Sequence, residues 1–507
     1  MLDFATAVDH SEIANTMHGI RYLLSCAVLI GACASPPQQN TEQEKKTQIE
    51  PVPAEPVNPY PSTYRTAAAA ATLIRGGTVL TGTGERLDNA DVLIVNGKVE
   101  AVGPNLSAPS GARVIDASGR WVTPGLIDVH SHLGVYPSPG VNAHGDGNEA
   151  TDPVTPNVWS EHGVWPQDPG FETALEGGIT SLQILPGSAN LIGGRAVTLK
   201  NVPATTYQAM KFPDAPQGLK MACGENPKRV YGGQNRAPST RMGNVAGYRQ
   251  AFADAQDYRE QWQKYERDVA EYQKKAAEKQ DKKDSEESDS PPTPPKRDLK
   301  LETLVGAMNG DIRVHIHCYR SDEMAIMLDL SKEFGFKISA FHHAIEAYKI
   351  ADLLAANGVC GAEWADWWGS KMEMFDGIQE NIALTDLPAG GCAIVHSDSD
   401  EGIQRLNQEA AKAMSRGNRA GLKIPPERAI RWLTANPARA LGIDKVTGTL
   451  EHGKMADVVI WNGTPFSVYA LAEQVFIDGQ VAYDRANPPP RPRSDFLLGQ
   501  PGAGEQP

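Results

Sequence analysis

The sequence predicts an α/β protein with one large barrel domain and one small β domain. Through the middle of the chain, short apolar strands alternate with helical patterns, as in the βα units of a parallel sheet. Segments rich in short strands flank this region on both sides. The 507 residues, 40% of them hydrophobic, suffice for a core of barrel size. We therefore expect a (β/α)8 barrel of the TIM type over residues 123–442, with a small β-sandwich formed by 72–122 and 443–485.

Two hairpins mark the predicted β domain. An Asn-Gly pair at 96–97 and an Asp-Gly pair at 478–479 each separate two short strands. Such pairs are typical of the type I′ turn, in which both central residues have positive φ. Because the two hairpins lie near opposite ends of the folded region, both ends are expected to contribute strands to the small domain. The flanking strands cover residues 92–95, 98–102, 475–477 and 480–483.

Residues 17–33 combine an arginine, a short apolar stretch and small residues before Cys33. The stretch is too short to span a bilayer comfortably and resembles a bacterial lipoprotein signal, with a buried or membrane helix as the alternative. The resemblance implies initiation near Met17, cleavage before Cys33 and acylation of that cysteine, so that residues 1–33 form the signal segment. We expect a protein of the bacterial cell envelope, held on a membrane by its lipid alone and facing the periplasm.

Three further segments have distinctive compositions. Proline among glutamine, glutamate and lysine predicts a disordered tether at 34–71, and residues 486–507 form a proline-rich tail. Residues 264–289 hold 16 charged residues in 26 and precede a run of prolines, which predicts an exposed charged helix and loop inserted in the barrel at about 250–300. Outside that stretch the sequence has no basic block, and its net charge of −14 argues against binding to nucleic acid.

The cysteines beyond the signal segment match no zinc knuckle in their spacing. An oxidising periplasm permits disulfides, but the sequence does not pair these residues. The favoured interpretation is four small apolar side chains in the barrel wall. They are Cys223, Cys318, Cys360 and Cys392.

Histidines and an aspartate stand at the ends of apolar strands. His130 and His132 are two residues apart, so in a strand both side chains point to one face and reach one metal ion. A lone His-x-His is equally typical of a surface pair or of core histidines, but His317, His343 and Asp398 end three later strands. The intervals of 26 and 55 residues between these three correspond to about one and two βα units of roughly 30 residues. In a barrel such strand ends meet on one face.

These residues, with Thr434-Ala435-Asn436-Pro437-Ala438 and the segment 448–458, resemble the amidohydrolase superfamily of metal-dependent hydrolases, in its imidazolonepropionase-like or dipeptidase-like branch. The similarity runs from about Leu73 to Tyr483. It implies one or two divalent ions, and zinc suits a site rich in imidazole. It also places the metal ligands on strands one, five, six and eight: His130 with His132, then His317, His343 and Asp398.

Strand four offers two residues that would bridge a pair of ions. In this superfamily the bridge is a carbamylated lysine or a glutamate. We expect that Glu225, at the strand end, is the bridging residue rather than Lys220. The alternative role for Glu225 is to cap the turn before Pro227. His315 and His342 are expected in the core or behind the ligands, and the alternative is that one of them substitutes for the neighbouring ligand His317 or His343.

The predicted function is hydrolysis of a carbon–nitrogen bond in an amide, cyclic amide or dipeptide, with a metal-activated water and Asp398 as catalytic base. The substrate is a small molecule that the sequence does not identify, and the oligomeric state is equally undetermined. The loop 185–194 either lines the substrate pocket or is a glycine-rich turn without a ligand. A catalytically inactive binding protein on the same barrel and a deaminase of the same superfamily are the alternatives.

Overall fold

The computed structural model of the protein describes residues 58–66, 68–138, 140–282 and 290–488. The expected signal segment with Cys33, most of the tether and the tail from residue 489 lie outside the described residues. The strands are β1 (Thr72–Leu80), β2 (Arg86–Val95), β3 (Lys98–Gly103), β4 (Arg113–Asp116), β5 (Trp121–Pro124), β6 (Leu126–Ser131), β7 (Ile179–Ile184), β8 (Ile192–Lys200), β9 (Gly218–Ala222), β10 (Arg313–His317), β11 (Ile338–His342), β12 (Cys360–Glu363), β13 (Ala393–Val395), β14 (Val458–Trp461), β15 (Ala472–Ile477) and β16 (Gln480–Asp484). The α-helices are α1 (Pro169–Glu176), α2 (Tyr207–Met210), α3 (Glu225–Gly232), α4 (Arg241–Lys282), α5 (Leu299–Asn309), α6 (Ser321–Phe334), α7 (Ala351–Ala356), α8 (Asn381–Thr385), α9 (Leu406–Arg419), α10 (Pro426–Ala429) and α11 (Ala435–Leu441).

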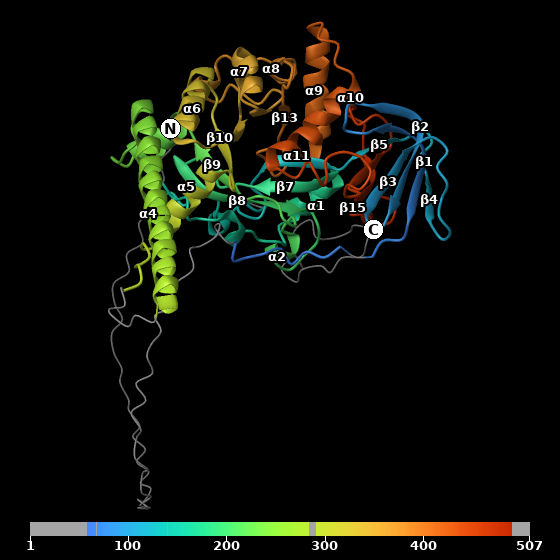
Figure 1. The fold of residues 1–507 in the computed structure, drawn as a ribbon. Helices are drawn as coiled ribbons and strands as arrows, with labels where there is room; N and C mark the ends of the chain where they lie inside the picture. Colours follow the sequence, from blue (N-terminus) through green and yellow to red (C-terminus); the bar gives the residue numbers. More distant parts are fainter. Residues whose placement is uncertain (1–57, 67, 139, 283–289, 489–507) are drawn as a thin grey trace, which may run out of the picture. The chain divides into compact units, whose positions relative to one another are not determined.

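Strands β6 to β13 form one eight-stranded sheet in chain order, with α5, α6 and α7 along its outer side (Figure 1). Neighbours are parallel between β6 and β7 and from β9 to β13. Strand β8 runs antiparallel to both β7 and β9, so the prediction of a regular (β/α)8 barrel is wrong at this position. The physical reason is the short connection 185–191, because a parallel pair needs a crossover of about ten residues or more.

The two edge strands of this sheet are joined by a buried carboxyl group. Ser397, which follows β13, donates its hydroxyl to Asp128 Oδ2 on β6, and the amide of Asp398 donates to the carbonyl of His130 at 3.0 Å. Asp128 is fully buried. Burial raises the pKa of its carboxyl group to about 7, although the hydrogen bonds from Ser397 and the His130 amide act in the opposite direction. These contacts bring β6 and β13 together where the candidate ligands lie.

The spacing between strand-end residues is explained by the elements between them. Helix α6 connects β10 to β11, which is one βα unit between His317 and His343. Helix α7, strand β12 and helix α8 lie between β11 and β13, which makes two units before Asp398. Strands β7 and β8 separate His132 from β9, as the 93-residue interval to Glu225 had suggested.

The strands of both flanks form a second sheet, in the order β16-β15-β14-β5-β1-β2-β3 with β4 paired to β1. Strand β14 pairs with β5 and joins the two flanks into one continuous sheet. Side chains of both flanks pack in one core cluster, which is consistent with the small β-sandwich expected from the two flanks. Both predicted hairpins are confirmed, and all four turn residues have φ between 48° and 75°. The side chains of Trp461 and Val475 pack in the same core cluster as Leu182 of β7, which couples this sheet to the barrel.

The last part of the predicted tether is ordered against the folded domain, which corrects the boundary at residue 71. Tyr64 donates its hydroxyl to Asp478 Oδ2 at 2.6 Å, and the hydroxyl of Ser62 donates to the carbonyl of Lys211 at 2.6 Å. The ring of Tyr60 lies edge-on to Trp159, with centroids 5.7 Å apart. Two tyrosines in a proline-rich segment therefore provide the contacts that composition alone did not reveal.

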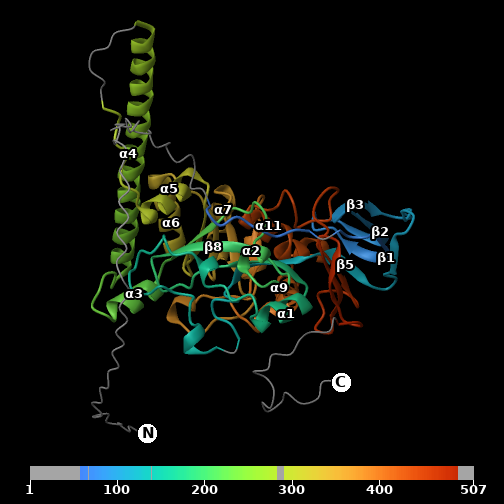
Figure 2. The ribbon, with the colours of Figure 1, turned by 90° about the horizontal axis from the view of Figure 1, so that it is seen from below.

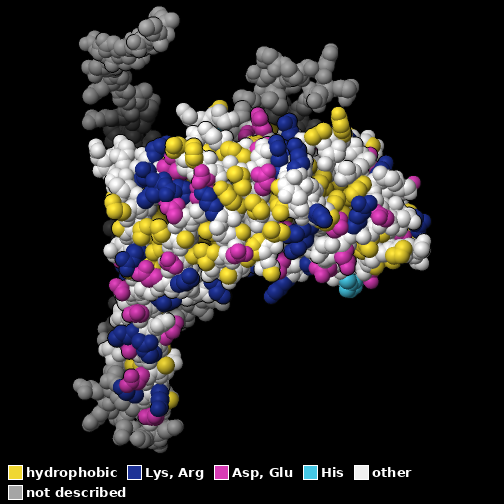
Figure 3. Space-filling model, turned by 90° about the horizontal axis from the view of Figure 1, so that it is seen from above, with side chains coloured by type: hydrophobic (Ala, Val, Ile, Leu, Met, Phe, Trp, Pro, Cys, Tyr) yellow, Lys and Arg dark blue, Asp and Glu magenta, His cyan; other side chains and the backbone are white. Residues whose placement is uncertain are grey.

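Helix α4 is the predicted insertion, but it begins at Arg241 and covers 42 residues (Figures 1 and 2). Its first half packs on the barrel through Tyr248, Phe252 and Ala255. Figure 3 shows acidic and basic side chains interspersed along its projecting part. Tyr265 and Val269 are nevertheless buried, so the start of the charged stretch is not wholly solvated. No helix among the described residues has the length and apolar composition to cross a membrane.

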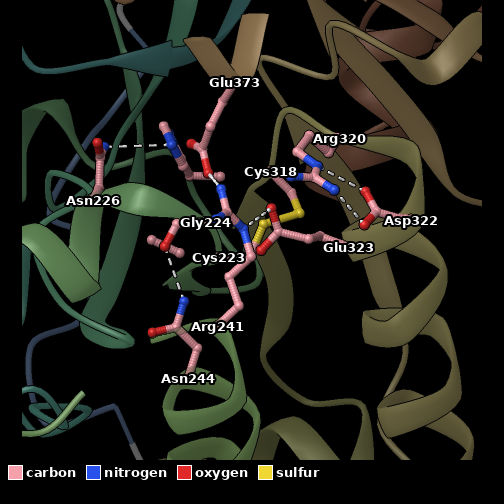
Figure 4. Close-up of a disulfide and its surroundings, with 12 residues drawn as sticks. Cys223, Gly224, Asn226, Arg241, Asn244, Cys318, Arg320, Asp322, Glu323 and Glu373 are labelled. Atoms are coloured by element: carbon pink, nitrogen blue, oxygen red, sulfur yellow. Dashed lines mark hydrogen bonds and ion pairs between the residues drawn. A yellow bond between two sulfur atoms is a disulfide. The ribbon is translucent and has the colours of Figure 1, made fainter. Parts of the chain in front are cut away.

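The four cysteines form two disulfides, so their interpretation as free apolar side chains is wrong. Cys223 and Cys318, with Cα atoms 5.2 Å apart, connect the segments that follow β9 and β10 (Figure 4). Cys360 and Cys392, with Cα atoms 4.6 Å apart, connect the beginnings of β12 and β13. Each bond joins neighbouring strands, one at the carboxyl end of the sheet and one at the opposite end. This pairing depends on strand order, which the cysteine spacing does not contain.

Candidate metal centre

His130 and His132 converge at the carboxyl end of β6. Their Nε2 atoms lie 3.3 Å apart, and His130 is fully buried. The Nδ1 of His132 lies 2.9 Å from the carbonyl oxygen of Leu185. Because a carbonyl only accepts, Nδ1 carries the proton and Nε2 keeps its lone pair toward His130. The pair is therefore oriented to bind one ion.

Asp398 completes this cluster from the other edge of the sheet. Its Oδ1 lies 3.1 Å from His132 Nε2 and 3.4 Å from His130 Nε2, and its Oδ2 lies 3.6 Å from Nε2 of His343. Burial, the largest factor, raises the pKa of this carboxyl group, but the neighbouring His132, His396 and Lys220 together lower the pKa below its ordinary value overall. Asp398 is therefore a carboxylate at neutral pH.

Lys220 lies in the middle of the candidate ligands. Its Nζ is 3.5 Å from Nε2 of His130 and donates to the carbonyl of Pro186 at 3.1 Å. The side chain is fully buried, and burial lowers the pKa of its amino group to about 8. Glu225 is the first residue of α3, three positions beyond the end of β9, and no hydrogen bond or ion pair between its side chain and these imidazoles is found among the described contacts. Lys220 thus lies beside His130 on the strand itself, whereas Glu225 lies beyond the strand end.

His317 and His343 form the other side of the cluster. Their ring centroids are 4.9 Å apart, and Nδ1 of each is buried without a hydrogen-bond partner. His343, directly after β11, and Asp398, three positions after the end of β13, both have positive φ, 55° and 51°. This left-handed conformation is uncommon for residues other than glycine and turns the backbone at the strand end. Both residues are thereby directed into the site.

His342 and His315 lie behind His130, as expected. The Nδ1 atoms of His130 and His342 are 2.8 Å apart, and Nε2 of His342 lies 2.9 Å from Nδ1 of His315. This chain of imidazoles fixes the ring orientation of His130 and leaves its Nε2 toward Asp398. The two residues position a candidate ligand and do not themselves reach the centre of the cluster.

His396 is a site residue that the sequence interpretation missed. It is buried, neither ring nitrogen has a hydrogen-bond partner, and its ligand atom groups with those of His130 and His343 within 4.8 Å. Its ring lies 4.7 Å from that of His343. The available signal was the His-x-Asp spacing of His396 and Asp398, which repeats the His-x-His spacing on β6.

The chemistry of these side chains fits a divalent metal. Neutral imidazoles and a carboxylate are zinc ligands, and unpaired buried imidazole nitrogens are unfavourable unless a ligand or water satisfies them. Burial, the largest factor, and the positive charge of Lys220 keep the pKa of both His130 and His317 well below its ordinary value, so both rings are neutral. The ligand atoms of one candidate trio, His130, His132 and Asp398, lie 3.1 to 3.4 Å apart.

The fold and this site define a barrel protein with a candidate metal centre at the carboxyl ends of its strands. A sequence profile of the Amidohydrolase family matches residues 121–483, and the chain belongs to that family. The chain is 32% identical over 489 residues to Amidohydrolase tasK of Hapsidospora irregularis. The aligned region covers 88% of this chain and 46% of that protein. It thus spans about half the length of this relative.

Two further similarities concern a shorter segment and a solved structure. Over 126 residues the chain is 35% identical to a dihydroorotase of Geobacter sulfurreducens, covering 25% of this chain and 24% of that protein. The crystal structure of an amidohydrolase from Thermotoga maritima MSB8 superposes with a TM-score of 0.69 at 35% identity, covering 82% of this chain and all of that one. The family is thereby established, while its imidazolonepropionase-like or dipeptidase-like branch stays a prediction.

Proposed function

We propose that the protein is a metal-dependent hydrolase that cleaves a carbon–nitrogen bond of a small amide, cyclic amide or dipeptide. The observation that carries this proposal is the convergence of His130, His132 and Asp398, whose ligand atoms lie 3.1 to 3.4 Å apart at the carboxyl ends of β6 and β13. Family membership and the similarity to proteins named amidohydrolase and dihydroorotase support this reaction class.

Two sets of residues are available to hold divalent ions. His130, His132 and Asp398 form one set, and His317 with His343 forms the other. Lys220 lies beside the first set, and its lowered pKa favours the neutral amine that carbamylation requires. This placement supports Lys220 over Glu225 as the bridge. When bound, the metal lowers the pKa of water and polarises a carbonyl group.

Asp398 is the proposed catalytic base. Its carboxylate accepts a proton from the attacking water and then donates that proton to the leaving nitrogen, so the group is regenerated in each cycle. The depressed pKa of Asp398 keeps it deprotonated before the reaction. The hydrogen bond of His132 to Leu185 and that of His130 to His342 hold the neighbouring rings in place during this transfer.

Metal analysis followed by a hydrolysis screen tests the proposal. Purified protein should contain divalent metal and hydrolyse at least one member of a panel of dipeptides, N-acyl amino acids and cyclic amides, with loss of activity on chelation. Release of ammonia from amino-substituted rings without cleavage of the panel would favour the deaminase. Metal-free protein without turnover on any class would favour the inactive binding protein.

We further propose that the enzyme is anchored in the bacterial cell envelope by lipid on Cys33 and faces the periplasm. The small residues before Cys33 and the two disulfides support this location, since disulfides persist in oxidising compartments. Mass spectrometry of the mature N-terminus should find an acylated Cys33. Cys33→Ser should release the protein from membranes, and an unmodified chain starting at Met1 would rule the anchor out.

A further inference from the structure

The segment 364–380, between β12 and α8, forms an aromatic wall beside the candidate metal centre. Trp364 stacks on the ring of His343 with centroids 4.3 Å apart, and its Nε1 donates to the carbonyl of Ser397 at 3.1 Å. Tyr319, which follows β10, lies edge-on to His317 at 4.5 Å. Trp364 and Tyr319 pack in one small cluster with Met374. This segment is therefore fixed against the rings that would hold the metal.

Lys371 is the cation that this segment brings to the site. Its Nζ donates to Oδ1 of Asn226 at 2.8 Å and to the hydroxyl of Tyr319 at 3.2 Å. Nδ2 of Asn226 lies in turn 3.4 Å from Nε2 of His317. Only one side chain thus separates the Lys371 ammonium from a candidate metal ligand. The side chain of Lys371 is half-buried and also borders a hollow of about 320 Å³ beside Trp368 and Phe375.

The charge of Lys371 is not neutralised by an ion pair. Both its hydrogen-bond acceptors are uncharged, and no described carboxylate forms an ion pair with it. Burial, the largest factor, and the charge of Arg229 lower the pKa of Lys371, whereas the carboxylates of Glu225, Glu373 and Asp398 favour its charged form without forming a described ion pair with it. Glu373 is already bound by the guanidinium of Arg241, which also lies 3.1 Å from Glu323 (Figure 4). A half-buried ammonium that donates only to uncharged groups, next to the candidate metal centre, is suited to an anionic ligand.

We propose that Lys371 binds a carboxylate of the substrate, so that the enzyme prefers amides whose amine half carries a free carboxylate, such as N-acyl amino acids or dipeptides. This inference rests on the proposed hydrolysis of a carbon–nitrogen bond at the His130–Asp398 centre. Lys371 has three donor hydrogens, and its two present acceptors leave one for the ligand. The hydroxyl of Tyr319 and the amide of Asn226 lie within the same network and would hold the ammonium in place.

Paired substrates distinguish this role from a purely structural one. Each N-acetyl amino acid is compared with its carboxamide, which has the same scissile bond and no charge. The wild type should hydrolyse the acid with a kcat/KM about 10- to 100-fold above that of the amide, mainly through KM. Lys371→Met should abolish this preference by lowering kcat/KM for the acid to about that of the amide, and Lys371→Arg should keep most of the preference.

Lys412→Met is the matched control. Lys412 also contacts the 364–380 segment, through an ion pair of 2.6 Å with Asp366, but it belongs to α9 and has no contact with Asn226 or Tyr319. Its loss should leave the preference for the acid intact. If Lys371→Met slows acid and amide equally, or if the wild type shows no preference for the acid, the proposed role of Lys371 is overturned.

Failure of the hydrolysis proposal gives a separate result. If no pair is cleaved, the proposed function is contradicted, and calorimetric binding of the same compounds tests Lys371 alone. Tighter binding of the acids than of the amides, lost in Lys371→Met and kept in Lys412→Met, would still support an anion site. Equal binding of acid and amide to the wild type would exclude it.

Discussion

The amino group of Lys220 lies 3.5 Å from Nε2 of His130 inside the sheet, whereas Glu225 starts a helix beyond it. We therefore expect Lys220→Met to lose at least one divalent ion per chain and Glu225→Gln to keep the wild-type metal content. Elemental analysis of the two variants, purified in parallel and checked for folding by circular dichroism, measures this. The opposite result would return the bridging role to Glu225.

Asp398→Asn keeps the shape of the side chain but removes its capacity to accept a proton. Hydrolysis of a confirmed substrate should fall by at least the ~10²-fold typical of losing general-base catalysis, with most of the metal retained on the histidines. The measurement is kcat with metal content on the same sample. Activity within a few-fold of the wild type would remove Asp398 from the mechanism.

His342→Phe removes the hydrogen bond that fixes His130 while keeping an aromatic ring of similar size. Loss of such a supporting partner typically lowers metal affinity 10- to 100-fold, and we expect a decrease in that range in a competition titration with a chelator. His452→Phe is the control, since the ring of that exposed histidine contacts the carbonyl of Glu100 far from the metal centre. Unchanged affinity in His342→Phe would show that His130 needs no such partner.

The disulfide between Cys360 and Cys392 closes a loop with a sequence separation of 32 residues. Chain-entropy arguments give about 3 to 4 kcal/mol for a loop of this size, so Cys360→Ser/Cys392→Ser should lower the free energy of unfolding by an amount of that order. Urea titration with and without reductant measures it. Without reductant the double variant should be less stable than the wild type by this amount, and the difference should disappear in reductant, which also breaks Cys223–Cys318 in both proteins.

Glu363 provides a pH test of burial. It is fully buried at the end of β12, and burial raises the pKa of its carboxyl group well above the ordinary value, although Thr385 opposes this shift. The pKa of Glu363 is higher in the folded protein than in the unfolded chain, so its protonated form contributes stability that is fully present below about pH 4.5. This contribution is lost as the pH rises through the folded-state pKa.

Glu363→Gln imitates the protonated group at every pH. The variant should therefore gain stability relative to the wild type between pH 5 and pH 8, by up to about 1.4 kcal/mol per pH unit. The difference in Tm across this range measures the effect. A difference that does not change with pH would show that Glu363 is ionised in the folded protein.

The sequence by itself determined those features that depend on a few neighbouring residues. The Asn96-Gly97 and Asp478-Gly479 turns fix their own hairpins because their backbone preferences are local. The two-residue spacing of His130 and His132 places both rings on one face of a strand for the same reason. The intervals between strand ends matched the number of βα units, and the family resemblance assigned the histidines and the aspartate to those strands.

Only the tertiary structure decided which side chains reach the centre of the site and which residues pair across strands. Lys220 of β9 lies beside His130, whereas Glu225 begins α3 beyond the strand, and Lys371 from the segment after β12 meets Asn226 of α3. The reversed β8, the two disulfides and the closure by Asp128 and Ser397 depend likewise on strand order. These contacts join residues up to 269 positions apart, and their geometry follows from register and closure of the sheet, which no local pattern of residues contains.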